Sequence, residues 1–443
     1  MKKVLILSYH FPPLNVIASQ RALGYANYLK NHGLEPTVLT FDWNKSPMDQ
    51  QCDKKSFYTK IIEEKNDRYT VIRIPVIKRR FLKFMGKQEG NLIYRIWILW
   101  CWLNGRLDVS PKVVEYGLSE YYYLRKFVKK GDYDIVIGIY SPHFHLKNAF
   151  RLYKKKEIPY VLDYRDLWDN VIIHQNYQPN LKQRMYDYFV SKYWKKWAKH
   201  AKVLTITSRP WADKLQEVVE KNVHVITNGF CHEEFNGRQI KKSRKFRILH
   251  TGSLYKHQDF TVFNEGLKIF IKELSPVDFE VKFLGAIRST YQGGGLNGFL
   301  SRDEFDSLEK LGGFVKFTER IPREEVMEEM MMANLLYIPT FPKAPGTYGG
   351  KIFEYLGSGI PIVAIPSDHG VIKELLEGTN SGHIFEEPYE FALYLKEVYE
   401  TWKTDSNEAE RHPSLNAEVL LYSRESQTKR MSDLIKNELD INN

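Results

Sequence analysis

Short apolar runs rich in β-branched residues recur along this chain, and each is followed by a polar or glycine-containing loop. Residues 4–8, 37–40 and 134–139 have this character in the first half, and helical stretches separate them. The same alternation begins again at residue 246. Alternating strands and helices favour parallel sheets, because a parallel strand pair needs a long crossover connection. The sequence therefore predicts an α/β fold built from two Rossmann-like βαβ domains.

The length of the chain agrees with two domains, since 443 residues with 43% apolar content can bury two substantial cores. The stretch 236–245 is polar and basic, which is the composition of a linker. We assign residues 1–235 to an N-terminal domain, 246–422 to a C-terminal domain and 423–443 to a final helix.

The bulk composition narrows the class of protein. The chain carries 65 basic and 54 acidic residues, and the net charge of +11 suits an anionic partner such as nucleotide phosphates or an acidic membrane surface. Cys52, Cys101 and Cys231 are widely spaced, which predicts neither a disulfide framework nor a zinc site. No apolar run reaches the roughly 18 residues of a membrane-spanning helix, and the first residues read as a strand. We expect a cytoplasmic protein, soluble or peripheral to a membrane.

The stretch 346–364 carries the strongest functional signal. Gly349 and Gly350 precede Lys351, and a short apolar-periodic helix with Glu354 near its start follows. Glycines let the backbone approach a ligand closely, and the amides at a helix start favour a phosphate, to which Lys351 adds a full charge. A carboxylate at Glu354 can accept two hydrogen bonds from a ribose diol. This combination is typical of a cradle for a nucleotide diphosphate.

Two other interpretations of this stretch compete with the cradle. A P-loop is excluded by the spacing, because Pro345 and Ile352 stand where that motif requires a glycine and a hydroxyl residue. The other rival is a plain helix–turn–strand unit, in which Lys351 and Glu354 are surface residues and the glycines only make turns.

Residues 351–362 resemble the K-L-F-E-Y-L-A-x-G-K-P-I signature of the retaining, nucleotide-sugar-dependent glycosyltransferases of family four. The resemblance implies the GT-B fold, in which two Rossmann-like domains face each other across a cleft and the last helix crosses back to the first domain. It also implies that Glu354 holds the donor ribose. Many members have a second glutamate eight positions earlier, where this chain has Gly346.

The start of the second domain resembles the phosphate-side loop of the same family. Gly252 follows a buried strand as in the family's G-x-L loop, although Ser253 stands where many members have arginine. Lys256 is then a candidate for the missing charge, and the backbone around Arg320 would bracket the base. The resemblance thus implies a donor site formed by Gly252, Ser253, Lys256, Arg320, Gly349, Gly350, Lys351 and Glu354.

Two segments of the N-terminal half resemble family elements that line the cleft on the acceptor side. Arg21 closes a segment like F-P-P…G-S-x-R, and Asp163, Arg165 and Asp166 belong to a segment like A-D-x-R-D-P-W. The alternatives are a helix-surface arginine at position 21 and a structural ion-pair cluster at positions 163–166.

A His-x-His pair, His143 and His145, follows the buried strand 134–139. Ligands of open α/β sheets collect at the carboxyl ends of strands, although most histidines in such places are structural. The segment resembles the family's S-P-P-x-x-x-H, whose histidine lies near the transferred sugar. This implies a catalytic role for one of the two without choosing between them.

Residues 78–103 have the most unusual composition of the chain. Six cations (Lys78, Arg79, Arg80, Lys83, Lys87 and Arg95) accompany Trp97, Trp100 and Trp102. An interfacial helix pair that binds an anionic membrane surface would have this composition. The alternative is a core helix of the N-terminal domain beside a solvated basic turn.

Taken together, the resemblance implies a retaining glycosyltransferase that moves a sugar from a nucleotide-diphosphate sugar to a glycan. The acceptor would be linked to polyprenyl diphosphate, in synthesis of a bacterial surface polysaccharide such as capsule or O-antigen. The resemblance also implies catalysis without a metal, and no Asp-x-Asp motif stands at a strand end to contradict this. We expect no cofactor and no nucleic-acid partner. A nucleotide-sugar epimerase of the same fold and a non-enzymatic membrane-surface protein remain as alternatives.

Overall fold

The structure is a computed structural model that describes residues 1–14, 16, 18–43, 60–167, 179–254, 258–286, 311–342, 344–405, 413 and 415–439. The chain divides into two compact units. The first, here the N-terminal unit, holds the described residues of Met1–Ile172, Asn176–Asn228 and Arg424–Asn443. The second, the C-terminal unit, holds the described residues of Gly229–Ser423.

The N-terminal unit is built on a sheet of eight strands in the order β3-β4-β2-β1-β5-β6-β7-β8 among the described residues. Neighbouring strands run parallel except for β3, which pairs antiparallel with β4 at one edge. The strands are β1 (Lys2–Leu7), β2 (Leu34–Phe41), β3 (Ile62–Lys65), β4 (Thr70–Ile74), β5 (Ile135–Ile139), β6 (Tyr160–Asp163), β7 (Val203–Ile206) and β8 (His224–Val225). β5 and β6 are buried at every position, as central parallel strands are.

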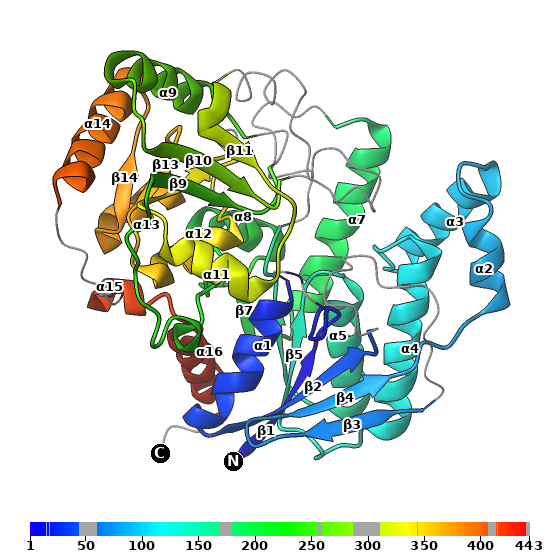
Figure 1. Ribbon diagram of the computed structural model, residues 1–443. Helices are drawn as coiled ribbons and strands as arrows, with labels where there is room; N and C mark the ends of the chain where they lie inside the picture. The colour runs from blue at the N-terminus through cyan, green and yellow to red at the C-terminus, as the bar shows by residue number, and fades with distance from the viewer. Residues whose placement is uncertain are drawn as a thin grey trace. The chain divides into compact units, whose positions relative to one another are not determined.

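Helices connect and cover these strands (Figure 1). They are α1 (Ser19–Tyr28), α2 (Arg80–Gly86), α3 (Leu92–Leu103), α4 (Pro111–Phe127), α5 (Phe144–Lys156), α7 (Leu181–Ala198), α8 (Arg209–Val219) and α16 (Arg424–Glu438), with a 3-10 turn at Leu29–His32. α16 packs beside α1, where Met431 and Ile435 join one core cluster with Ala22 and Tyr25. The last helix of the described chain therefore completes a face of this unit.

α2 and α3 form a helical pair (Figure 1). Within this pair, α2 packs against α4 and α3 packs against α7. α3 buries one face, on which Trp97, Ile98, Cys101 and Trp102 lie. Its other face is open to solvent, with Trp100 among the exposed side chains. With only 12 residues, α3 is shorter than the roughly 20 needed to cross a bilayer. None of the helices described here has both the length and the apolar character of a membrane span.

The C-terminal unit contains a six-stranded, fully parallel sheet in the order β11-β10-β9-β12-β13-β14, counted over its described residues. The strands are β9 (Phe246–Thr251), β10 (Phe279–Leu284), β11 (Val315–Phe317), β12 (Leu335–Pro339), β13 (Ile362–Ile365) and β14 (Gly382–Ile384). The helices are α9 (Thr261–Leu274), α11 (Arg323–Met331), α12 (Gly350–Ser358), α13 (Val371–Thr379), α14 (Pro388–Thr404) and α15 (Ala417–Leu420), with 3-10 turns at His232–Glu234 and Gly312–Phe314.

Apolar side chains fill both faces of this second sheet. One core cluster joins α11, α12 and α13 to the strands through residues such as Met330, Phe353 and Leu376. The other joins α9 and α14 through Phe263 and Phe391, whose rings stack 5.5 Å apart. Since parallel sheets require cover on both sides, this layering follows from the fully buried strands. Two parallel α/β units confirm the predicted fold class.

Candidate functional site

The predicted phosphate cradle lies at the start of α12, where the loop after β12 turns into the helix. Gly349 is the N-cap in an extended conformation, and a Cβ added there would meet no atom within 4 Å. The first amides of a helix have no intrahelical acceptor and carry partial positive charge. The position that a side chain of residue 349 would take is empty, which leaves room for a ligand beside the helix start.

Lys351 leads from this helix start to the loop after β9. Its Nζ lies 3.4 Å from the backbone oxygen of Ser253. Gly252 has φ of +91°, and a Cβ there would lie 2.6 Å from both Cε and Nζ of Lys351. The glycine is therefore required twice, for its left-handed backbone and for the space that the lysine side chain occupies.

A second cation reaches the same loop. The Nη2 atom of Arg320 donates a hydrogen bond of 3.0 Å to Oγ of Ser253. The sequence had suggested only that the backbone near Arg320 brackets a base, so this placement of its side chain is new. Arg320 and Lys351 thus both contact Ser253, at the position where many family members carry an arginine on the loop itself. Lys256 lies outside the described residues.

The pKa of Lys351 is lowered from its ordinary 10.5 to about 8, because burial outweighs the opposing effect of Glu354 and the charge of Arg320 acts in the same direction as burial. A lysine with a lowered pKa gains from a second anionic neighbour, because the anion favours the ammonium form. The electrostatics of the site therefore favour a multiply charged group such as a diphosphate.

Glu354 is not the surface residue of the rival interpretation, since only 8% of it is exposed. Its Oε1 lies 3.1 Å from Nη1 of Arg323, and Nε and Nη2 of the same arginine bind both carboxylate oxygens of Glu234 at 3.1 and 2.6 Å. Arg323 loses solvation on burial, but the two carboxylates outweigh this and raise its pKa. The arginine fixes the orientation of Glu354.

Sequence reasoning did not identify Arg323. It begins α11, and its contact with Glu234 spans 89 positions. Nothing in the local pattern marks it, because its partners come together only once strands and helices are assembled.

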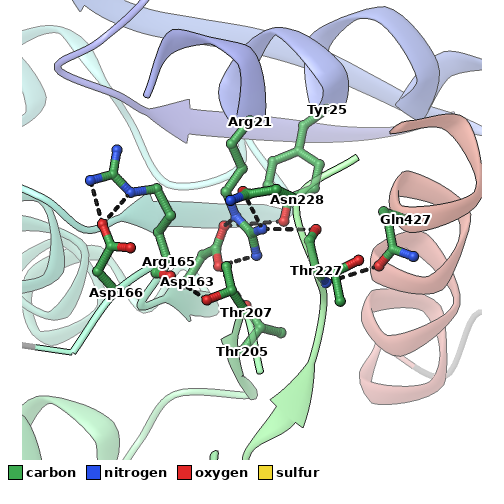
Figure 2. A network of polar contacts seen from close by, with 10 residues as sticks. All are labelled: Arg21, Tyr25, Asp163, Arg165, Asp166, Thr205, Thr207, Thr227, Asn228 and Gln427. Atoms are coloured by element: carbon green, nitrogen blue, oxygen red, sulfur yellow. Dashed lines mark hydrogen bonds and ion pairs between the residues drawn. The ribbon is translucent and has the colours of Figure 1, made fainter. Parts of the chain in front are cut away.

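In the N-terminal unit, Arg21 and Asp163 form a buried bidentate ion pair (Figure 2). Nε and Nη2 of Arg21 donate to the two carboxylate oxygens of Asp163 at 2.6 and 2.7 Å, and the side chains are 3% and 0% exposed. Nη1 donates to the backbone oxygen of Thr227 at 3.1 Å. Tyr25 and Thr205 donate to Asp163 at 3.1 and 2.8 Å. Charge-assisted pairs of this geometry are strong.

This pairing decides what Arg21 and Asp163 can do. Burial disfavours the charge of Arg21, but Asp163 outweighs that effect and the pKa of Arg21 is raised. The idea of a helix-surface arginine is wrong, because the network ties α1, β6 and β7 together. Every nitrogen of the guanidinium has a protein acceptor, so the pair is a structural connection beneath the carboxyl ends of the strands.

Arg165 and Asp166 follow β6 and form a second, more exposed pair (Figure 2). The Nε and Nη2 atoms of Arg165 lie 2.7 and 2.5 Å from Oδ2 of Asp166. The hydroxyl of Thr207 donates to the backbone oxygen of Arg165 at 2.8 Å, which holds this tip in place. Both side chains remain partly accessible, so they differ from the buried pair below them.

His143 is buried at the start of α5 and contacts two aromatic side chains. The indole Nε1 of Trp194 donates to Nδ1 at 3.0 Å, which leaves the proton on Nε2, 3.0 Å from the hydroxyl of Tyr186. Burial lowers the pKa of His143 to about 3 from an ordinary 6.5. The ring is therefore neutral, with a tautomer set by the tryptophan.

His145 points elsewhere. Its Nδ1 lies 2.7 Å from Oε2 of Glu120, and both side chains are almost fully buried. Asn148 donates to the other oxygen of Glu120 at 3.0 Å. The structure thus separates the two histidines, placing His143 in an aromatic pocket with Tyr186 and His145 in a contact with a carboxylate.

Across the described part of the chain, no three His, Cys, Asp or Glu side chains gather in the manner of a metal site. What gathers instead is positive charge in the C-terminal unit, at Lys351 and Arg320, with a fixed carboxylate at Glu354. Such a set can bind a diphosphate and an adjoining diol.

Comparison with known proteins gives this geometry a context. Residues 18–234 match the family described as Glycosyltransferase Family 4. No curated protein matches the sequence. Among solved structures, a sucrose-phosphate synthase from Thermosynechococcus elongatus is 14% identical with a TM-score of 0.58, and all of both chains is covered. A glycosyltransferase from Rickettsia africae is 13% identical with a TM-score of 0.60, covering 100% of this chain and 99% of that one.

A third structure, the Anabaena protein HepE in complex with UDP and glucose, is 15% identical with a TM-score of 0.51 and covers 100% of this chain and 98% of that chain. At these identities the likeness shows the fold, which confirms the predicted GT-B architecture. The chain as a whole therefore has the fold of the GT-B glycosyltransferases, and its residues 18–234 are similar to Glycosyltransferase Family 4.

Proposed function

We propose that the protein is a retaining glycosyltransferase that uses a nucleotide-diphosphate sugar as donor. The observation that carries this proposal is the meeting of Lys351 and Arg320 at Ser253, beside the open helix start at Gly349. Two cations and a set of helix-start amides would hold the diphosphate. Glu354 would accept hydrogen bonds from the ribose hydroxyls, in an orientation set by Arg323.

The same groups would assist the reaction. When the bond between the sugar and the diphosphate breaks, negative charge develops on the leaving phosphate oxygen. Lys351, at the start of α12, and Arg320 both contact Ser253, and fixed donors of this kind stabilise developing charge without reorganising. The solved relative in complex with UDP and glucose supports a nucleotide donor of this general type.

We further propose a glycan acceptor on polyprenyl diphosphate, brought to the enzyme at the inner face of the cell membrane, as in assembly of capsule or O-antigen. The support is the solvent-facing side of α2 and α3. There Phe81, Leu92, Ile96 and Leu103 are each more than half exposed. Lys78, Arg80, Lys83 and Lys87 lie exposed on or beside the same helices.

Of the three tryptophans in residues 78–103, two fit the interpretation as a core helix and one fits the interpretation as a membrane-binding helix. Trp97 and Trp102 are core residues, so the expectation that all three face a membrane is wrong for these two. Trp100 is 44% exposed and lies among the apolar side chains of the open face. Soluble monomers rarely leave a contiguous apolar patch ringed by cations, and amphipathic helices of this kind bind membrane interfaces.

The test has two steps. A thermal-shift and calorimetric screen of nucleotide diphosphates should find one that stabilises the protein by about 2.7 kcal/mol at a hundred times its dissociation constant. The matching nucleotide sugar should then be consumed only when an acceptor is present. Conversion of the sugar without an acceptor would show an epimerase instead, and vesicle binding without any nucleotide binding would show a membrane-surface protein.

A further inference from the structure

A small cavity of about 30 Å³ lies in the N-terminal unit between α4, α5 and the segment that joins α3 to α4. Three cations, Arg106, Lys147 and Arg151, are among the residues that line it. A water molecule needs roughly 10–15 Å³ of such space. The cavity therefore holds about two or three oxygen-sized atoms, which is too little space for a sugar or a base but enough for part of one phosphate group.

The three cations have little to balance their charge. Nζ of Lys147 donates to the backbone oxygen of Asn104 at 2.6 Å, which uses one of its three donors. The guanidinium of Arg106 lies over the ring of Trp100 and that of Arg151 over Tyr121, each at 4.6 Å. Among the residues that the structure describes, no carboxylate lies within 4.0 Å of any of these three charges.

This arrangement is unfavourable by itself. More than nine-tenths of Lys147 is buried, and burial followed by the charges of Arg151 and Arg106 lowers its pKa to about 7. An uncompensated buried charge destabilises a protein unless a partner neutralises it. A bound anion would provide that partner for all three side chains at once.

Asp108 is the one carboxylate on the cavity wall, within the described residues, and its charge is directed elsewhere. Its two oxygens accept hydrogen bonds from the backbone amides of His143 and Phe144, at 3.3 and 3.1 Å. The negative charge of Asp108 therefore balances the partial positive charge at the start of α5 rather than the charges of the three cations.

We propose that Arg106, Lys147 and Arg151 bind a phosphate group carried by a lipid. Arg106 follows closely after α3 and stacks on Trp100, which is exposed on the apolar face of that helix. A phosphate at the level of the headgroups would thus meet the cavity when α2 and α3 contact a membrane. The assignment to a lipid rests on the proposed membrane docking, whereas the phosphate chemistry rests on the cavity alone.

The first experiment measures inorganic phosphate by isothermal titration with the full chain. Lys147→Gln and Arg151→Gln should each weaken binding roughly ten- to hundredfold, the loss expected for one charge-assisted hydrogen bond. Lys154→Gln is the matched control, because it removes a charge from an exposed position of the same helix. Any binding of phosphate at Lys351 is common to all four proteins, so the difference between them isolates the cavity.

The second experiment measures co-sedimentation with phosphatidylcholine vesicles that contain phosphatidic acid, whose phosphate is unblocked. Vesicles with phosphatidylserine at equal surface potential serve as the comparison. Wild type and Lys154→Gln should bind vesicles with phosphatidic acid about tenfold more tightly than vesicles with phosphatidylserine. This preference corresponds to the lower end of the loss of phosphate affinity expected in the first experiment. Lys147→Gln should bind both kinds of vesicle equally.

A purely structural lysine would give a different result. Lys147→Met would then lower the unfolding temperature whether or not phosphate is present, whereas we expect it to be at least as stable as wild type without phosphate. Unaltered phosphate binding in both Lys147→Gln and Arg151→Gln overturns the site. Loss of free-phosphate binding without any vesicle preference overturns the lipid as source. Absence of all vesicle binding with Lys147-dependent phosphate binding would refute the membrane docking and keep the phosphate site.

Discussion

The side chain of Lys351 occupies the space that a Cβ on residue 252 would fill, with Cε and Nζ both 2.6 Å from that point. Gly252→Ala should therefore push the ammonium out of the cradle and strain the backbone at φ of +91°. We expect nucleotide-diphosphate binding to weaken at least tenfold, measured by calorimetry, because a charge-assisted hydrogen bond contributes about 1.5–3 kcal/mol.

Gly378→Ala is the control for this change, since a Cβ at that position in α13 meets nothing within 4 Å. It should leave nucleotide affinity unchanged and stabilise the helix by roughly 0.5–1 kcal/mol. Equal affinity in Gly252→Ala and wild type would contradict the placement of the diphosphate beside this loop.

Glu354→Gln tests the ribose contact. The substitution keeps the shape of the side chain but removes its charge, so nucleotide-diphosphate binding should weaken by about 1.5–3 kcal/mol with the fold retained. Glu324→Gln, which changes an exposed glutamate on α11, is the comparison and should bind as wild type does. If the two variants bind alike, Glu354 does not hold the donor.

Replacing the two histidines separately should give unlike results. His145→Ala leaves Glu120 buried without its neighbour, so we expect a loss of stability of about 1–3 kcal/mol. His143→Ala should lower turnover while the dissociation constant of the donor stays near that of wild type. Turnover at the wild-type rate in both variants would make the whole segment structural.

Acid should destabilise the N-terminal unit through His143. The unfolded chain binds a proton near the ordinary pKa of 6.5, whereas the folded imidazole does so only near 3, so stability falls as pH drops below about 6.5. One such histidine contributes a slope of about 1.4 kcal/mol per pH unit. Asp108 acts in the opposite direction between its ordinary 3.8 and about 6, because burial raises its pKa. Denaturant unfolding of His143→Gln should show a smaller slope between pH 6 and 4, and an unchanged slope would refute the burial effect.

Membrane binding by α2 and α3 should have a salt-sensitive and a salt-resistant part. Arg80→Glu with Lys83→Glu reverses two exposed charges and should weaken binding to anionic vesicles by about 1 kcal/mol or more per residue at low salt. Phe81→Ser with Ile96→Ser should remove the part that persists at high salt. Val277→Ser, on an exposed apolar residue of the C-terminal unit, is the control. No sedimentation of the wild type at low salt would exclude docking through this face.

Much of the fold could be predicted because the strands are local patterns. Residues 134–139 read as a buried strand and β5 covers Ile135–Ile139. The helix periodicity also contained the answer for α3, since Trp97 and Cys101 are four positions apart and share a buried face, while Trp100 does not.

The polar contacts could not be predicted in the same way. Arg320 reaches Ser253 across 67 positions and Arg323 reaches Glu234 across 89. Contacts between residues so far apart in the sequence depend on the order of strands in the sheet, which no local pattern specifies. The resemblance identifies Arg21 and Asp163 as candidate site residues. Only the folded structure shows that they form an ion pair with each other.

The position of α16 has a consequence for how the protein is made. Gln427 on this helix accepts a hydrogen bond from the backbone amide of Thr227, 200 positions earlier in the chain. At about 5–20 residues per second, a ribosome needs roughly 10–40 s to pass from one to the other. During that interval, the surface of α1 that Met431 and Ile435 later cover is exposed on the nascent chain. The N-terminal unit therefore cannot complete its core until α16 has emerged from the ribosome.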